Sequence, residues 1–286
     1  MRACPSLSLS LSPGPIVRRP TLRRAGRVDR ASPARKTTQV VVNANSSTAK
    51  TIKVCGVTSP EDAKLASSGG ANLIGMILWP KAPRSVSLET ARAIAEESRR
   101  HGSEAVGVFV DESAQTIASV CDAVGITYAQ LHGDQARASF NDLPDHLGVI
   151  YVVHADSSGA IRTALPTRTG TGDGTGTGDG DGTGTGTGTG ARERGAPDWY
   201  LVDSMKGGSG EKFDWDAVQP PTGSKRGWLL AGGLTDENVA AAIRTTRCDG
   251  VDVSSGVCDE TKLKKDPRKV EAYIRGATQA FAQLDT

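Results

Sequence analysis

The sequence predicts a single (β/α)₈ TIM barrel, an α/β fold, because eight short apolar runs alternate with helical segments along most of its 286 residues. Most of these runs lack a polar–apolar alternation, as expected for strands buried on both faces. Eight strands with helices between them over about 235 residues fit one closed parallel barrel. The runs are Ile52–Cys55, Leu73–Leu78, Ala105–Val110, Tyr128–Leu131, Val149–Val153, Trp199–Val202, Trp228–Ala231 and Gly250–Val253.

The helices between the runs carry start signals. Ser59-Pro60 precedes two acids, which is an N-cap followed by a first-turn proline and by carboxylates at the positive helix end. Ser87 opens the next helix, and Thr235-Asp236-Glu237-Asn238 begins a later one. Pro267 opens the last helix, where apolar residues recur at helical spacing.

One helix of the expected alternation is weakly supported. After the fifth run only Ser157–Leu165 is available for it. An open doubly wound sheet is the alternative architecture, although no G-x-G-x-x-G follows the first strand to support it.

Residues 1–47 differ from the rest in composition. They hold nine Lys/Arg against one acid, Asp29, and are rich in Ser, Pro, Ala and Thr. This composition predicts a disordered plastid transit peptide; a basic tail that binds nucleic acid is the alternative. Removing this segment turns the net charge from +2 to −6, with 25 Lys/Arg against 31 Asp/Glu. Residues 48–286, the barrel domain, are therefore not expected to bind nucleic acid.

A second unusual segment is Gly170–Gly190, where glycine occupies every even position. Alternating glycine has high backbone entropy and supplies no side chains for a core. We expect a disordered surface insertion at 168–192, since the entropy of loop closure grows only slowly with length. The period of two would also fit a strand, but such a strand would bury almost nothing.

The cysteines argue against a metal or disulfide framework. Cys4, Cys55, Cys121, Cys248 and Cys258 form no C-x-x-C pair and have no His cluster nearby. No segment approaches the roughly 20 apolar residues of a transmembrane helix.

The ends of the predicted strands are polar and rich in glycine. In a parallel barrel these ends meet at one face, where active sites form. The candidate segments are Cys55-Gly56, Pro80–Arg84, His132-Gly133-Asp134, Asp203-Ser204, Gly232-Gly233 and Ser254-Ser255-Gly256.

Taken in order, the motifs around these strand ends are Lys53–Thr58, Trp79–Arg84, Gln130–Asp134, Leu201–Ser204, Gly207–Gly210 with Phe213–Trp215, Ala231–Leu234 and Asp252–Val257. Together they resemble the phosphoribosylanthranilate isomerase family over about residues 51 to 285. The resemblance implies a cofactor-free Amadori rearrangement in tryptophan biosynthesis. It converts N-(5-phosphoribosyl)anthranilate to 1-(2-carboxyphenylamino)-1-deoxyribulose 5-phosphate.

The resemblance also implies an acid and a base. Asp203 would protonate the ribose ring oxygen, and a buried strand end favours the protonated carboxyl that this step needs. Cys55 would remove the C2 proton; since a free thiol titrates at about 8.5, this role calls for an environment that favours the thiolate. The alternative for Cys55 is a small buried hydrophobe.

The binding roles are likewise implied. Arg84 would grip the anthranilate carboxylate with two hydrogen bonds, or else be a solvated loop arginine. Asp252 would lie near the sugar hydroxyls, or else cap its strand. The phosphate would be bound by backbone N–H groups and hydroxyls of Gly232, Gly233, Ser254, Ser255 and Gly256, whose glycines could equally make tight turns.

Some positions carry weaker or divergent signals. Gly207-Gly208-Ser209-Gly210 could form a lid over the site. His132 is expected to be structural rather than a general base. Met76–Trp79 replaces a strand end that is usually rich in Phe and Tyr, and Cys258 stands where an acid is usual.

Three functions remain: this isomerase, another barrel enzyme acting on phosphoribosyl or indole intermediates, and a non-catalytic binding protein. The presence of both Cys55 and Asp203 within their motifs favours the first. The expected partner is a small phosphorylated substrate, with no cofactor, metal, nucleic acid or membrane, and the protein is expected to be a monomer or a homodimer.

Overall fold

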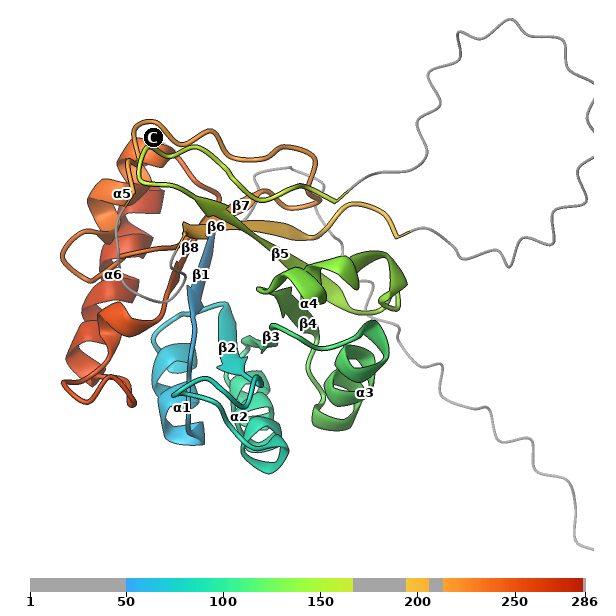
Figure 1. Cartoon of the computed structure of the whole chain (residues 1–286). Helices are drawn as coiled ribbons and strands as arrows, with labels where there is room; N and C mark the ends of the chain where they lie inside the picture. The colour runs from blue at the N-terminus through green and yellow to red at the C-terminus, as the bar shows by residue number, and fades with distance from the viewer. Residues whose placement is uncertain (1–49, 167–193, 206–212, 285–286) are drawn as a thin grey trace, which may run out of the picture. The chain divides into compact units, whose positions relative to one another are not determined.

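Eight parallel strands close into a barrel in the computed structural model, which describes residues 50–166, 194–205 and 213–284 (Figure 1). The last strand pairs with the first, with Thr51 opposite Gly250 and Val54 opposite Val253. The predicted fold is confirmed, and the open-sheet alternative is wrong. The strands are β1 (Thr51–Val54), β2 (Leu73–Ile77), β3 (Glu104–Phe109), β4 (Tyr128–Leu131), β5 (Gly148–Ala155), β6 (Trp199–Ser204), β7 (Trp228–Leu230) and β8 (Gly250–Val253).

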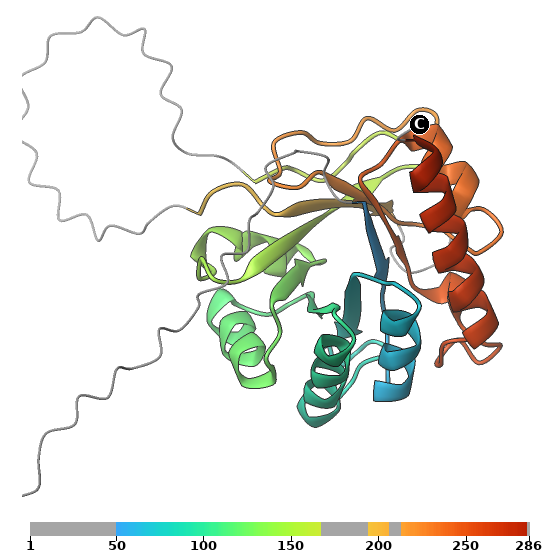
Figure 2. The ribbon, with the colours of Figure 1, turned by 180° about the vertical axis from the view of Figure 1, so that it is seen from behind.

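Helices pack on the outside of this barrel, and two predicted caps are present. The Ser59 hydroxyl accepts from the backbone N–H of Asp62, and the Ser87 hydroxyl accepts from that of Thr90. Neighbouring helices lie side by side along the outer surface, as both ribbon views show (Figures 1 and 2). The helices are α1 (Pro60–Ser68), α2 (Leu88–Arg100), α3 (Ala114–Val124), α4 (Asp134–Ala138), α5 (Val239–Thr246) and α6 (Pro267–Leu284), with 3₁₀ turns at η1 (Phe140–Asp142) and η2 (Ser255–Val257).

The helix expected over Ser157–Leu165 is wrong. The Asp156 carboxylate instead accepts from the backbone N–H groups of Ser158 and Ala160 and closes a tight turn. Gly159 continues this turn with a φ of +81°, a conformation that a helix does not contain. A short polar side chain bonded to its own backbone competes with helix formation, and that competition decides the structure here.

The start of α5 also differs from the prediction. Asn238 Oδ1 accepts from the backbone N–H of Thr235 at 2.8 Å, so residues 235–238 form a turn of their own. The helix therefore begins at Val239.

The core has two layers, and alternate strand residues supply each. Inside the barrel lie Leu73, Val106, Tyr128, Ile150, Val152, Trp199, Leu201, Leu229 and Ala231. A larger cluster between strands and helices includes Val54, Ile74, Val153 and Tyr273. The barrel interior is thus a packed core and not a pore, and the free space lies above it, at the strand ends.

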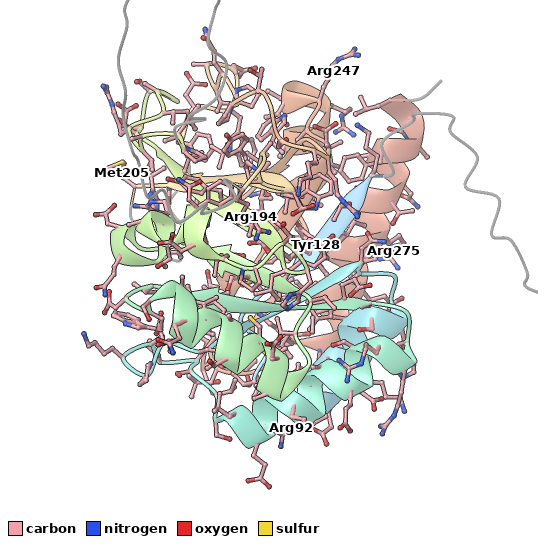
Figure 3. All side chains as sticks on the ribbon, turned by 90° about the vertical axis from the view of Figure 1, so that its right-hand side faces the viewer. Arg92, Tyr128, Arg194, Met205, Arg247 and Arg275 are labelled. Carbon is pink, nitrogen blue, oxygen red and sulfur yellow. The ribbon has the colours of Figure 1, made fainter. Side chains whose placement is uncertain are left out.

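Arg194 attaches the chain before β6 to the segment before β5. Its guanidinium donates to the carbonyls of Leu143 at 3.1 Å and Pro144 at 2.6 Å, and also to that of Leu147. Figure 3 places Arg194 towards the middle of the view, with the surface arginines Arg92 and Arg275 near its edge. No motif in the sequence pointed to this buried arginine.

Several predictions concern residues outside those described. The transit peptide at 1–47, the glycine-rich insertion at 168–192 and the loop Gly207–Gly210 fall there. Their boundaries and roles stay predictions. Within the described ranges, no helix combines the length and apolar character that a bilayer span requires.

Candidate active site

A cavity of about 820 Å³ opens at the carboxyl ends of the strands, where the sequence placed the site. It brings together residues from seven of the eight strand ends and their loops. Among the predicted site residues, its walls include Cys55, Arg84, Asp203, Gly233, Asp252, Ser254, Ser255 and Gly256. Gly232 lines a smaller adjoining cavity of about 40 Å³ together with most of these loop residues.

Cys55 follows β1 and is only 6% exposed. Gly75 on β2 makes room for its side chain, since a Cβ there would lie 2.7 Å from Cys55 Sγ. The backbone N–H of Cys55 donates to Val253 on β8 at 2.8 Å, and its carbonyl accepts from Lys265 Nζ at 2.6 Å. The thiol therefore sits at a rigid point of the cavity wall.

Asp203 lies near the end of β6 and is 7% exposed. Its Oδ1 accepts from the backbone N–H of Ser204 at 2.8 Å, which fixes the carboxyl orientation. A buried carboxyl that still reaches the cavity is the arrangement a general acid needs.

Arg84 lies beside the start of the first loop. A Cβ on Gly56 would be 3.0 Å from Arg84 Nη1, and Gly56 has a φ of +67°, so this position suits glycine on both counts. Arg84 Nη1 donates to the sulfur of Cys258 at 3.5 Å. The guanidinium thus lies beside Gly56, the residue after Cys55, and borders the cavity, where it can receive a carboxylate.

Glycines shape the other end of the site. Gly232 and Gly233 have φ values of +81° and +66°, and a Cβ on Gly256 would lie 1.9 Å from the carbonyl oxygen of Leu234. The loops after β7 and β8 therefore meet closely around the smaller cavity. Ser254 and Ser255 add hydroxyls there.

Asp252 does not cap its strand. It lies inside β8, opposite Lys53 of β1, and its Oδ1 accepts from Lys53 Nζ at 3.0 Å. The same carboxylate borders the cavity, so it remains available to a sugar hydroxyl.

His132 also lies in the cavity wall. Burial lowers its pKa to about 4, with smaller contributions from the nearby charges of His154, Arg137 and Lys53. The ring is therefore neutral at neutral pH and packs edge-on against His154, with centroids 5.4 Å apart. The expectation that His132 is structural stays a prediction.

An apolar wall completes the cavity, and motif reasoning did not find most of it. It consists of Ile77, Trp79, Val108, Val110, Leu234 and Leu263. Continuing the alternation of β3 would have indicated Val108 and Val110, because they share a face with Val106 of the barrel interior. Trp79 is held by a hydrogen bond from its Nε1 to Asp111 Oδ2 of 2.8 Å.

Comparison with known proteins matches this chain to one family model. The model described as N-(5'phosphoribosyl)anthranilate (PRA) isomerase covers residues 52–178 and 184–276. The chain belongs to the phosphoribosylanthranilate isomerase family. Membership confirms the fold and the reaction class that the resemblance implied, an isomerase of tryptophan biosynthesis.

Individual members of the isomerase family agree with this assignment. The chloroplastic N-(5'-phosphoribosyl)anthranilate isomerase 1 of Arabidopsis thaliana is 37% identical over 224 residues, which is 78% of this chain and 73% of that protein. The isomerase of Chlamydia felis is 34% identical and covers 79% of this chain and 96% of its own.

Solved structures of the family are also similar. The isomerase of Thermotoga maritima is 30% identical with a TM-score of 0.60 and covers 80% of this chain and 99% of its own. A family structure in complex with reduced 1-(o-carboxyphenylamino)-1-deoxyribulose 5-phosphate is 26% identical with a TM-score of 0.55, and covers 80% and 99% of the two chains.

Proposed function

We propose that the chain converts N-(5-phosphoribosyl)anthranilate to 1-(2-carboxyphenylamino)-1-deoxyribulose 5-phosphate, with Asp203 as general acid and Cys55 as general base. The observation that carries this proposal is the single cavity that these two residues share with Arg84. Family membership supplies the reaction class, and the solved relative holding a reduced form of the product supports the identity of the ligand.

The first step opens the ribose ring. Asp203 donates its proton to the ring oxygen, the bond between C1 and that oxygen breaks, and the anthranilate nitrogen supplies the electrons for a C1–N double bond. The hydrogen bond from the backbone N–H of Ser204 aims the buried carboxyl of Asp203.

The second step moves a proton from carbon. The Cys55 thiolate removes the C2 proton, and the C–H electrons form a C1–C2 double bond while the nitrogen regains its lone pair. The resulting enol becomes the ketone when its hydroxyl proton is lost and C1 is protonated. General base catalysis of this kind contributes about 10²–10⁴-fold to the rate.

The two ends of the substrate are bound by different groups. Arg84 would hold the carboxylate of the anthranilate ring with paired hydrogen bonds. The phosphate would lie against the loops after β7 and β8, where Gly232, Gly233 and Gly256 let backbone N–H groups approach closely and Ser254 and Ser255 add hydroxyls. The Asp252 carboxylate would accept a hydrogen bond from a sugar hydroxyl.

The test follows the loss of substrate fluorescence over time. It compares the protein of residues 48–286 with two of its variants. Cys55→Ala and Asp203→Asn are expected to abolish turnover while the circular dichroism spectrum stays that of the parent. Near-normal turnover in either variant would refute the acid–base assignment. No turnover by the parent protein, if folded, would refute the proposed reaction.

The proposal extends to domain organisation, location and assembly. Residues 48–286 would form the enzyme, 168–192 an insertion and 1–47 a plastid transit peptide, in keeping with the chloroplastic names of two Arabidopsis relatives. The assembly would be a monomer or a homodimer, and one solved relative concerns monomers generated from a dimeric isomerase. Sedimentation at assay concentration distinguishes the two.

A further inference from the structure

Lys53 lies directly beneath the active-site cavity. Its side chain is 0% exposed, and it is absent from the cavity walls that Cys55 and Asp252 border. Lys53 stands two residues before Cys55 on the first strand, so both side chains project into the barrel. Lys53 is therefore close to the proposed base but cannot touch a substrate.

The ammonium of Lys53 has two neighbours. One is Asp252, whose Oδ1 lies 3.0 Å from Nζ because the two residues are directly paired across β1 and β8. The other is Cys55, the next residue along the chain whose side chain lies on the same inward face. Burial would lower the pKa of Lys53, but the charges of Asp252 and Cys55 and hydrogen bonds to both raise it above its usual value. Lys53 thus stays charged at neutral pH.

Stability does not account for this lysine. The free energy lost when two charges are removed from water is about as large as their attraction to each other. Replacing a buried ion pair with apolar residues is therefore often neutral or stabilising. The layer of the barrel interior around it is built from apolar side chains such as Leu73, Val106 and Leu229. A charged pair in this position calls for a role at the site above it.

We propose that Lys53 is a positioning residue that holds Cys55 in its thiolate form, and that its partner Asp252 keeps Lys53 charged. This inference rests on the proposed role of Cys55 as the base. A cation next to a cysteine stabilises the thiolate, which is the form that accepts a proton. When the thiolate takes the C2 proton of the substrate, Lys53 keeps all its own protons, and Asp252 remains as its partner.

Other charged or titratable groups face Cys55, but none replaces Lys53. Lys265 donates to the backbone carbonyls of Cys55 and Ser254 and to the sulfur of Cys258 at 3.6 Å, so its hydrogen bonds go to groups other than the Cys55 thiol. In the proposed function, Arg84 binds the anthranilate carboxylate of the substrate. The groups around Cys55 are Lys53, Arg84, His132, Asp203, Asp252 and Lys265.

The test measures alkylation of Cys55 by iodoacetamide in the full chain without substrate, as a function of pH. Peptide mass spectrometry separates Cys55 from Cys4, Cys121, Cys248 and Cys258 in the same sample. Lys53→Met, which keeps the length of the side chain without its charge, is expected to lower the rate at neutral pH at least about tenfold. The variant should regain the parent rate at alkaline pH.

One matched variant separates charge from shape. Lys53→Arg keeps the charge and should restore most of the rate at neutral pH. In turnover, Lys53→Met should lower kcat and leave KM nearly unchanged, because Lys53 does not touch the substrate.

The double variant Lys53→Met with Asp252→Asn guards against misfolding, since it leaves no unpaired buried charge. A folded double variant with slow alkylation at neutral pH would support the inference. Parent-like alkylation in Lys53→Met or in the double variant would overturn it, even if Cys55 proves to be the base. Full turnover by Cys55→Ala would instead refute the proposed function while leaving the alkylation result interpretable.

Discussion

At the scale of single residues, glycines determine where the reactive side chains can lie. Gly75 leaves space for the Cys55 sulfur, and Gly56 lets the chain turn beside Arg84. Any side chain at Gly75 would push against Cys55 itself, since the nearest contact is the sulfur at 2.7 Å. These constraints are invisible in the sequence, where Gly75 is an ordinary glycine within a strand and Gly56 an ordinary glycine after one.

Arg84→Ala tests the binding end of the site at the same scale. Loss of a charged pair of hydrogen bonds is expected to raise KM about 10- to 100-fold, with a smaller change in kcat if the contact is equal in ground and transition states. Steady-state kinetics of the fluorescent substrate give both constants. An unchanged KM would remove Arg84 from the site.

At the scale of elements, local signals located all eight strands and several helix starts. The hydroxyls of Ser59 and Ser87 cap their helices as predicted, because such caps depend only on neighbouring residues. The turn at Asp156 and the late start of α5 were missed. In both cases a short polar side chain bonds to nearby backbone and outcompetes the helix.

Arg194 gives an element-scale prediction. Arg194→Met should destabilise the protein by at least about 2 kcal/mol, because it leaves buried carbonyls before β5 without their charged donor. Urea unfolding of the barrel domain measures the change. Arg92→Met is the matched control, since its guanidinium also bonds a carbonyl, that of Ala123 at 2.8 Å, but on the exposed surface. Equal losses in both variants would contradict a special role for Arg194.

At the scale of the whole molecule, closure of the barrel creates the site. The pairing of β1 with β8 joins the first and last strands of the barrel. Lys53 and Asp252 are 199 positions apart in the sequence, yet Lys53 Nζ lies 3.0 Å from Asp252 Oδ1. The loops after β7 and β8 reach Cys55 and Arg84 only because the sheet is closed. An open sheet would have left these groups at opposite edges.

The predicted transit peptide, residues 1–47, gives the prediction at the scale of the whole molecule. Residues 1–47 fused to a fluorescent reporter should be imported by isolated plastids and cleaved, because their basic, hydroxyl-rich composition is that of a transit peptide. Enzyme activity should not need them, so residues 48–286 should match the full chain in kcat/KM. A reporter that stays outside the plastids and binds DNA would support the basic-tail alternative instead.

The sequence by itself determined the eight strands and the order of the motifs, and the resemblance carried by those motifs implied the proposed acid and base. The strands follow from local periodicity, and each motif is a short segment that can be read without the rest of the chain. Only the tertiary structure decided that Lys53 pairs with Asp252 beneath Cys55, that Arg84 contacts Cys258, and that Leu263 belongs to the apolar wall. Such contacts depend on register and closure, which join strands and loops that no local pattern relates.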